Sequence, residues 1–575
     1  MSNWNLDNFD SIYASLAQSA YTGRPIVFDY SSLKKDQQKA LDSGQSVRFD
    51  FSQDVEKKGQ ITQGASGDGY PDKSDPKASK TELYLQPDQQ GLLTDEKTGY
   101  QAYYVSDTAE INQDTHQTYF VVRGSDGFGI DTDKLAKDPL DYLANMNPSD
   151  FNYEDWINND MAFALTDAIV PQAGEATKGM KAKIAELNAR AASDAQMSIT
   201  GHSLGTMVSI QGAAGLSHAE LQKVDQIVLF NGPDATKSLQ KAGYSKEHIQ
   251  ELGSKTTYYV NPFDPVSMLN REKPWEEQLG TVKVIVPMEY TSMTDKHSSH
   301  DFGAYQIDSH GNPLAASADY HPELLTAGHD LAALEKKSID KLKEYIPEDL
   351  IQSIVALSPD DFNELAKLAQ KVAKNPSLSG GAEVIEMAAK LGINVSDLVS
   401  ALTHAGELKD VFQNFQKEYQ AIIDKAKKES LKWTRDNINS FHDKIKQATG
   451  AQKILLRTEL LYMATQLAEE DVTNKVEAAK KHISDVKDEV KVLSEIAIAA
   501  SKGLGAHLSD SEIEELTSEI KMSNIWDEGT EEADKAALDT YKNKMSTFGS
   551  DLVLAAQNIE AVDSQQAGDI FANLS

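Results

Sequence analysis

The pattern Gly-x-Ser-x-Gly at residues 201–205 is the strongest chemical signal in the sequence. It is typical of a nucleophile elbow, a sharp strand-to-helix turn that holds one serine hydroxyl at its crest. Glycines are needed there because the turn is strained and the strand and helix pass too closely for larger side chains. The flanking sequence fits, because residues 196–200 read as a short strand and the residues after Gly205 read as a helix rich in small side chains. We therefore predict that Ser203 is a nucleophile and that Gly201 and Gly205 are the elbow glycines.

A serine hydroxyl needs a base and an acid to become a good nucleophile. A neighbouring imidazole accepts its proton, and a carboxylate fixes the tautomer of that imidazole. Hydrolases with this elbow place these groups in the chain order Ser, acid, His. Asp264 follows the second predicted strand after the elbow and is favoured over Asp234, which follows the first. His300 is favoured as the base over His297 in the same loop. The other histidines considered are His310, His321 and His329 as weaker candidates for the base, and His202 as a packing residue.

A hydrolase of this kind also needs backbone N–H groups for the oxyanion of the tetrahedral intermediate. One comes from the residue after the nucleophile, here Leu204, and the other from a loop after an early strand. Residues 123–125, Arg-Gly-Ser, directly follow an apolar strand at residues 118–122, so Ser125 is the predicted second donor. The resulting mechanism is acyl transfer in two steps and requires no metal or organic cofactor.

The first half of the chain alternates between predicted strands and helices. Strands are expected at residues 47–51, 101–106, 118–122, 196–200, 226–231, 256–261 and 282–286, with helices at 4–20, within 151–190 and after the elbow, and a long exposed loop at 52–80. This alternation predicts an α/β fold with a mostly parallel sheet covered by helices on both faces. In such sheets ligands bind beyond the carboxyl ends of the strands, which is where the predicted site residues fall.

The second half of the chain is predicted to be entirely helical. From about residue 323 onward, apolar residues recur three or four positions apart, and Ala, Glu, Lys and Leu dominate. Helices are expected at about 323–346, 348–358, 360–374, 381–447, 449–503, 509–524 and 530–573. We therefore expect a hydrolase domain at residues 1–322, a helical linker or insert at 323–450, and an elongated helical partner-binding domain at 451–575.

Composition excludes several classes of function. The net charge of −33 argues against nucleic acid as a partner, because phosphate binding requires clustered Lys and Arg. The chain has no cysteine, so disulfides and thiolate metal sites are impossible. No apolar run approaches the roughly 18 residues of a transmembrane helix, and the first ten residues lack the layout of a Sec signal peptide. Any export is therefore expected to use a signal elsewhere in the chain.

Four motifs, in their order along the chain, resemble the class 3-like bacterial lipases. They are the Arg-Gly-Ser turn at 123–125, Gly-His-Ser-Leu-Gly at 201–205, Asn-Pro-Phe-Asp-Pro-Val at 261–266 and His-Asp-Phe-Gly-Ala-Tyr at 300–305. The resemblance covers roughly residues 1–320. It implies an α/β-hydrolase fold, hydrolysis of lipid esters, a triad of Ser203, Asp264 and His300, and Ser125 in the oxyanion hole.

The whole layout resembles the lipase toxins exported by type VII secretion in Gram-positive bacteria. The run from Tyr541 to Asn573 looks like the closing helix of LXG and WXG100-type substrates, although the LXG-like region is C-terminal here instead of N-terminal. This resemblance implies phospholipase A-type activity against membranes. It also implies small helical partner proteins on the C-terminal helices, an immunity protein in the producer, and a cytoplasmic stage before export.

Two other interpretations stay open at this point. The chain can be an intracellular carboxylesterase acting on small esters, or a helical interaction protein with an inactive hydrolase domain. Residues 128–150 carry scattered apolar side chains and are read either as a lid or as a plain surface loop.

Overall fold

The computed structural model divides the chain into two compact units, Met1–Ser430 with Ser564–Ser575, and Leu431–Asp563. The structure describes residues 10–21, 26–50, 82–125, 166–287, 290–293, 295, 298–300, 314–346, 350, 353, 359–447, 451–505 and 507–572. The long loop expected at residues 52–80, most of the 151–170 region and the possible lid at 128–150 lie outside these ranges.

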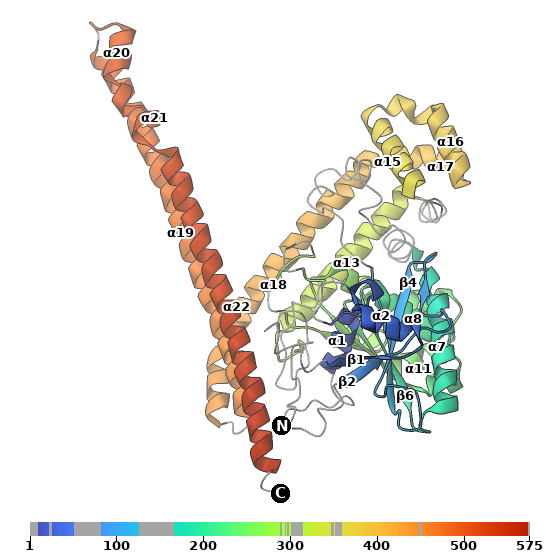
Figure 1. Cartoon of the computed structure of the whole chain (residues 1–575). Helices are drawn as coiled ribbons and strands as arrows, with labels where there is room; N and C mark the ends of the chain where they lie inside the picture. Colours follow the sequence, from blue (N-terminus) through green and yellow to red (C-terminus); the bar gives the residue numbers. More distant parts are fainter. Residues whose placement is uncertain are drawn as a thin grey trace. The chain divides into compact units, whose positions relative to one another are not determined.

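Within the described residues, nine strands form one sheet in unit 1 (Figure 1). The strands are β1 (Val47–Asp50), β2 (Glu82–Leu85), β3 (Thr94–Asp95), β4 (Tyr100–Ser106), β5 (Gln117–Val122), β6 (Gln196–His202), β7 (Val224–Phe230), β8 (Thr256–Val260) and β9 (Thr281–Val284). Their order is β1-β2-β4-β5-β6-β7-β8-β9, and β3 pairs with β4. The strands β5 to β9 are parallel, and the pairings make every strand except β1 and β4 point the same way. The fold is therefore mixed α/β with a mostly parallel sheet, as expected, and every predicted strand is present.

Helices cover both faces of this sheet. On one face of β6, the Ser198 hydroxyl accepts a hydrogen bond from the hydroxyl of Tyr13 in α1 (Asp10–Ser19). The Thr200 hydroxyl donates one to the carbonyl oxygen of the same residue. The alternate residues Met197 and Ile199 point into the core formed with α7 (Pro171–Arg190) and α8 (Leu204–Ala214) on the other face. A strand buried on both faces needs apolar or hydrogen-bonded residues at every position, which explains the continuous burial of residues 197–202. The shorter helices of the same region are η1 (Tyr30–Ser32), α2 (Lys35–Asp42), α9 (His218–Leu221), α10 (Thr236–Lys241), α11 (Lys246–Ser254), α12 (Pro265–Met268) and η7 (Trp275–Glu277).

The helices that follow the sheet pack in part onto its core. They are α13 (Pro322–Tyr345), α15 (Pro359–Lys374), η9 (Pro376–Gly380), α16 (Ala382–Leu391), α17 (Val395–Thr403) and α18 (Ala405–Gln447). Leu324 and Leu331 of α13 and Tyr419 and Ile423 of α18 belong to the same apolar core as the strands. Unit 1 runs past residue 322, where the sequence predicts a domain boundary, and continues to Ser430.

The prediction of one continuous helix over residues 381–447 is wrong. The chain forms three helices there, and the first ends at Gly392, which adopts a left-handed φ of 68°. This conformation closes a helix and is readily adopted only by glycine. The break lets α15, α16 and α17 fold together around a small core of their own, which contains Leu368, Val384 and Leu398.

Unit 2 is built mainly from two long helices that lie side by side. These are α19 (Ala451–Leu504) and α22 (Glu528–Ala572), connected by α20 (Asp510–Leu516), η10 (Ser518–Ile520) and α21 (Met522–Ile525) (Figure 1). Ion pairs between Lys480 and Asp539 and between Lys487 and Glu531 join the long helices. No helix in the described part of the chain is both long enough and apolar enough to span a membrane.

Arg271 is a fully buried cation in the core of unit 1. Its guanidinium donates hydrogen bonds to the carbonyl oxygens of Ser267 at 2.7 Å and Gly232 at 2.9 Å, and lies 3.9 Å from a carboxylate oxygen of Asp234. A buried charge is tolerated only when it is paired and its donors are satisfied. Arg271 thus ties the loop after β7 to the segment after β8.

We predict that Arg271→Met destabilises the protein by about 3 kcal/mol or more, because it leaves Asp234 buried without its cation. The measurement is equilibrium urea unfolding of the variant and of wild type. The control is Arg190→Met, which removes an arginine whose side chain is 67% exposed and should change the unfolding free energy by less than about 0.5 kcal/mol. Equal effects of the two substitutions would contradict the prediction.

Candidate active site

Ser203 occupies a strained turn between β6 and α8. The strand ends at His202 and the helix begins at Leu204, and Ser203 between them has φ 57° and ψ −132°. A non-glycine residue with positive φ costs on the order of 1–3 kcal/mol, and such residues cluster at functional sites. The side chain is largely buried, with 4% of the residue exposed.

The two glycines beside Ser203 allow a very close approach of backbone segments. A Cβ atom on Gly201 would lie 2.5 Å from the carbonyl oxygen of Gly205. A Cβ atom on Gly205 would lie 2.5 Å from the carbonyl oxygen of Val122 at the end of β5. Both contacts are with backbone, which cannot move aside cheaply. The geometry thus explains why these two positions are glycine.

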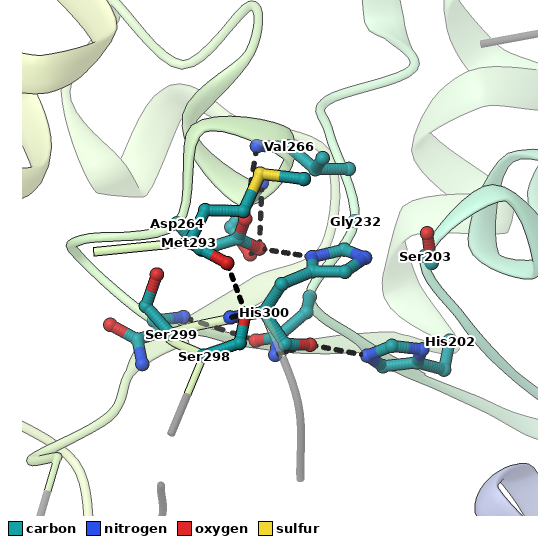
Figure 2. Close-up of polar contacts among 12 residues, drawn as sticks. His202, Ser203, Gly232, Asp264, Val266, Met293, Ser298, Ser299 and His300 are labelled. Atoms are coloured by element: carbon teal, nitrogen blue, oxygen red, sulfur yellow. Dashed lines mark hydrogen bonds and ion pairs between the residues drawn. The ribbon is translucent and has the colours of Figure 1, made fainter. Parts of the chain in front are cut away.

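Asp264 and His300 form a buried hydrogen-bonded pair. His300 Nδ1 lies 2.9 Å from Asp264 Oδ2, and Asp264 has no exposed surface (Figure 2). The carboxylate also accepts hydrogen bonds from the backbone N–H groups of Val266 and Ser267, each at 3.1 Å, and from the Ser267 hydroxyl. Because Nδ1 must carry the proton to donate to this carboxylate, Nε2 of the neutral ring keeps its lone pair. In Figure 2 the Ser203 hydroxyl lies on the Nε2 side of the ring.

The backbone of His300 is fixed independently of its ring. Its carbonyl oxygen accepts hydrogen bonds from Asn231 Nδ2 at 2.9 Å and from His202 Nε2 at 2.7 Å. Its N–H donates to the Ser298 hydroxyl at 3.1 Å. Asn231 Oδ1 also accepts the N–H of Asn261 at 3.2 Å, so one amide side chain joins the loops after β7, after β8 and after β9.

His202 supports the site instead of acting as its base. A carbonyl oxygen only accepts hydrogen bonds, so Nε2 of His202 is the donor to His300. In the neutral ring, Nδ1 then accepts from the hydroxyl of Tyr21, which lies 3.0 Å away. The rings of His202 and His300 have centroids 4.8 Å apart. Sequence reasoning assigned His202 to packing, and missed its polar role together with Tyr21 and Asn231.

The alternative acid and bases occupy other environments where the structure describes them. Asp234 accepts hydrogen bonds from the N–H groups of Thr236 and Leu279 and is paired with Arg271. His321 lies 2.7 Å from Glu323. The ring of His329 lies against that of Trp275, with centroids 4.3 Å apart, and burial lowers the pKa of its imidazole. His297 and His310 lie outside the described residues.

The segment expected to complete the oxyanion hole lies directly against the nucleophile. A Cβ atom on Gly124 would lie 2.4 Å from the carbonyl oxygen of His202 and 3.1 Å from Ser203 Cβ. Ser125 follows it and is buried, and Leu204 is the first residue of α8. The N–H groups at a helix start are unpaired within the helix and carry a partial positive charge, which favours an anion. Leu204 follows Ser203 directly, and Ser125 follows Gly124, the residue that packs against Ser203.

Among the described residues, no group of three or more His, Asp or Glu side chains could hold a metal ion. Ser203, Asp264 and His300 supply a hydroxyl, a carboxylate and an imidazole, the three groups from which a serine nucleophile, its orienting acid and its base can be built. Comparison with protein-family models, with curated proteins and with solved structures found no match for this chain.

We predict that Gly124→Ala slows labelling of Ser203 by a fluorophosphonate probe by at least tenfold. The added methyl would lie 2.2 Å from the Tyr21 hydroxyl and 2.4 Å from a backbone oxygen, so the segment has to move away from Ser203. Moving a backbone N–H group away from the oxyanion position is expected to cost one to two orders of magnitude in rate. The measurement is the labelling rate, followed by mass spectrometry of the intact protein.

The matched control is Gly174→Ala on α7, where an added Cβ meets nothing within 4 Å. This variant should label at the wild-type rate. Wild-type labelling of Gly124→Ala would show that the segment at 123–125 is not part of the site.

Proposed function

We propose that this chain is a serine ester hydrolase of the α/β-hydrolase fold that acts on lipid esters. The observation that carries the proposal is the buried Asp264–His300 hydrogen bond beside a serine held at positive φ. A chain that no longer needed a strained serine would gain stability by relaxing it, since the strain costs about 1–3 kcal/mol. This favours a working enzyme over an inactive hydrolase domain.

The proposed reaction proceeds through an acyl-enzyme. Ser203 Oγ attacks the ester carbonyl carbon while His300 Nε2 takes the hydroxyl proton, and Asp264 stabilises the resulting imidazolium. The negative charge on the carbonyl oxygen is held by the N–H groups of Leu204 and Ser125. The intermediate collapses, the alcohol leaves with the proton from His300, and an acyl group remains on Ser203. His300 then activates a water molecule, which releases the fatty acid and restores the serine.

The lipid substrate is supported by the resemblance of four motifs to class 3-like bacterial lipases. The alternative, a carboxylesterase on small soluble esters, uses the same three residues and differs only in substrate size. A series of esters of increasing acyl length separates the two, because a lipase prefers long chains and aggregated substrate.

We further propose that the protein is a phospholipase A-type toxin exported by type VII secretion. Unit 2 supports a role in partner binding, because α19 carries exposed apolar side chains, among them Leu493 at 65% and Ile496 at 59% exposure. Exposed apolar groups that recur on one helix are typical of a protein-binding surface. Small helical proteins would cover this surface before export, and an immunity protein would protect the producer's own membrane.

We predict that wild-type protein releases fatty acid from phosphatidylglycerol vesicles and that Ser203→Ala does not. Removing the nucleophile should lower the rate by several orders of magnitude. Acyl release is measured by mass spectrometry, alongside hydrolysis of a short soluble ester by the same two proteins. Cleavage of the short ester alone would favour the carboxylesterase, and two equally inert proteins would contradict the proposed activity.

We predict that export by a Gram-positive host with a type VII system requires the exposed apolar side chains of α19. The double substitution Leu493→Ser and Ile496→Ser should retain the protein inside the cell, because a helical partner would lose its apolar contacts. The measurement is the amount of protein in the culture supernatant. The control is the wild-type protein expressed in a host whose type VII system is inactivated. Undiminished export of the double variant would argue against this surface as the partner site.

A further inference from the structure

The hydroxyl of Tyr419 reaches the two loops that carry the acid and the base. Tyr419 lies on α18, far beyond the last strand in the sequence, yet it packs in the core of unit 1. It donates a hydrogen bond to the carbonyl oxygen of Phe263 and accepts one from the N–H of Met293 at 3.0 Å. A single side chain from the helical region thus bridges the loop after β8 and the loop after β9.

Both contacts lead directly to the Asp264–His300 pair. Phe263 is the residue before Asp264, and its carbonyl oxygen also accepts the Ser299 hydroxyl at 3.0 Å, beside His300. The carbonyl oxygen of Met293 accepts the Ser298 hydroxyl at 2.7 Å, and that hydroxyl accepts the N–H of His300 at 3.1 Å. A shift of the Tyr419 hydroxyl would therefore move the backbone on both sides of the pair.

The environment keeps Tyr419 in the form that can make both bonds. The residue is 7% exposed, and burial raises the pKa of its phenol, so the hydroxyl keeps its proton at neutral pH. A neutral phenol can donate one hydrogen bond and accept another at the same time. This is the pattern of the two contacts with Phe263 and Met293.

We propose that Tyr419 is a positioning residue that sets the separation of Asp264 and His300, which makes α18 a part of the catalytic unit. This inference rests on the proposed hydrolase function. It differs from a role in docking α18 alone, because the helix has other anchors that do not touch either loop backbone. Lys425 pairs with Asp330 at 2.9 Å, and the buried Thr434 hydroxyl donates a hydrogen bond to Gln466 Oε1 at 3.1 Å.

The test compares Tyr419→Phe with Thr434→Val in the full-length protein. Tyr419→Phe keeps the ring in the core and removes only the hydroxyl, while Thr434→Val removes a buried hydroxyl of the same helix that bonds to Gln466 and to neither loop. The first variant should lower kcat about tenfold or more with KM unchanged, since loss of alignment by a fraction of an ångström weakens the reacting state more than binding. The second should leave both constants at their wild-type values.

Hydrogen exchange followed by mass spectrometry reports on the same contact without any activity. Val266 and Ser267 donate their N–H groups to Asp264 and not to Tyr419. In Tyr419→Phe these amides should exchange faster than in wild type, and in Thr434→Val they should not.

Equal kcat values for Tyr419→Phe and wild type, or equal losses in the two variants, would overturn the proposal. An inert wild-type protein would instead overturn the proposed hydrolase function. In that case the exchange measurement alone decides on Tyr419: faster exchange at Val266 and Ser267 supports its positioning role, and unchanged exchange overturns it.

Discussion

The buried carboxylate of Asp264 is the group on which the candidate site depends. A charge without exposed surface is stable only when hydrogen bonds replace the water it has lost. Asp264 satisfies this with two backbone N–H groups at the start of α12, one hydroxyl and one imidazole. The three donors from its own loop fix the carboxylate whether or not His300 is present. The side of the carboxylate that these donors leave open then determines where the His300 ring must lie. It also determines which ring nitrogen carries the proton.

Parallel strands make such a cluster possible. The loops after β6, β7, β8 and β9 all leave the same edge of the sheet, so residues far apart in sequence meet there. Asn231 uses this geometry, since it stands directly after β7 at a φ of 50° and reaches both Asn261 and His300. Asparagine tolerates this conformation better than most residues, because its short amide can bond to nearby backbone. One strained residue thus fixes the relative position of two loops.

The sequence was sufficient to predict what depends on local pattern. The glycines of the elbow, the strands from 101 to 286 and the start of the helical region follow from spacing and composition, and the structure contains them. The sequence could not reveal Tyr21 or Tyr419, because each acts on residues more than a hundred positions away and neither lies in a recognisable motif. It did not show that α13 and α18 pack on the core of the sheet, since an amphipathic helix has the same periodicity whether its apolar face packs on a sheet or on another helix. The break at Gly392 was missed for a related reason: a lone glycine is compatible with a continuous helix until its φ is known.

The helices after the sheet also contribute to the electrostatics around Asp264. Glu335 of α13 is buried. The pKa of its carboxyl is raised well above the ordinary value, mainly because the group loses its hydration and secondly because Asp264 repels its charge. A raised pKa means that the folded protein binds this proton more tightly than the unfolded chain does, so folding stability falls as pH rises above the ordinary pKa of a glutamate. The raised pKa of Glu335 reflects the free-energy cost of placing a second carboxylate charge close to Asp264. A domain that ended before α13 would contain neither Glu335 nor Tyr419, so α13 and the first part of α18 belong to the structure that surrounds the candidate site.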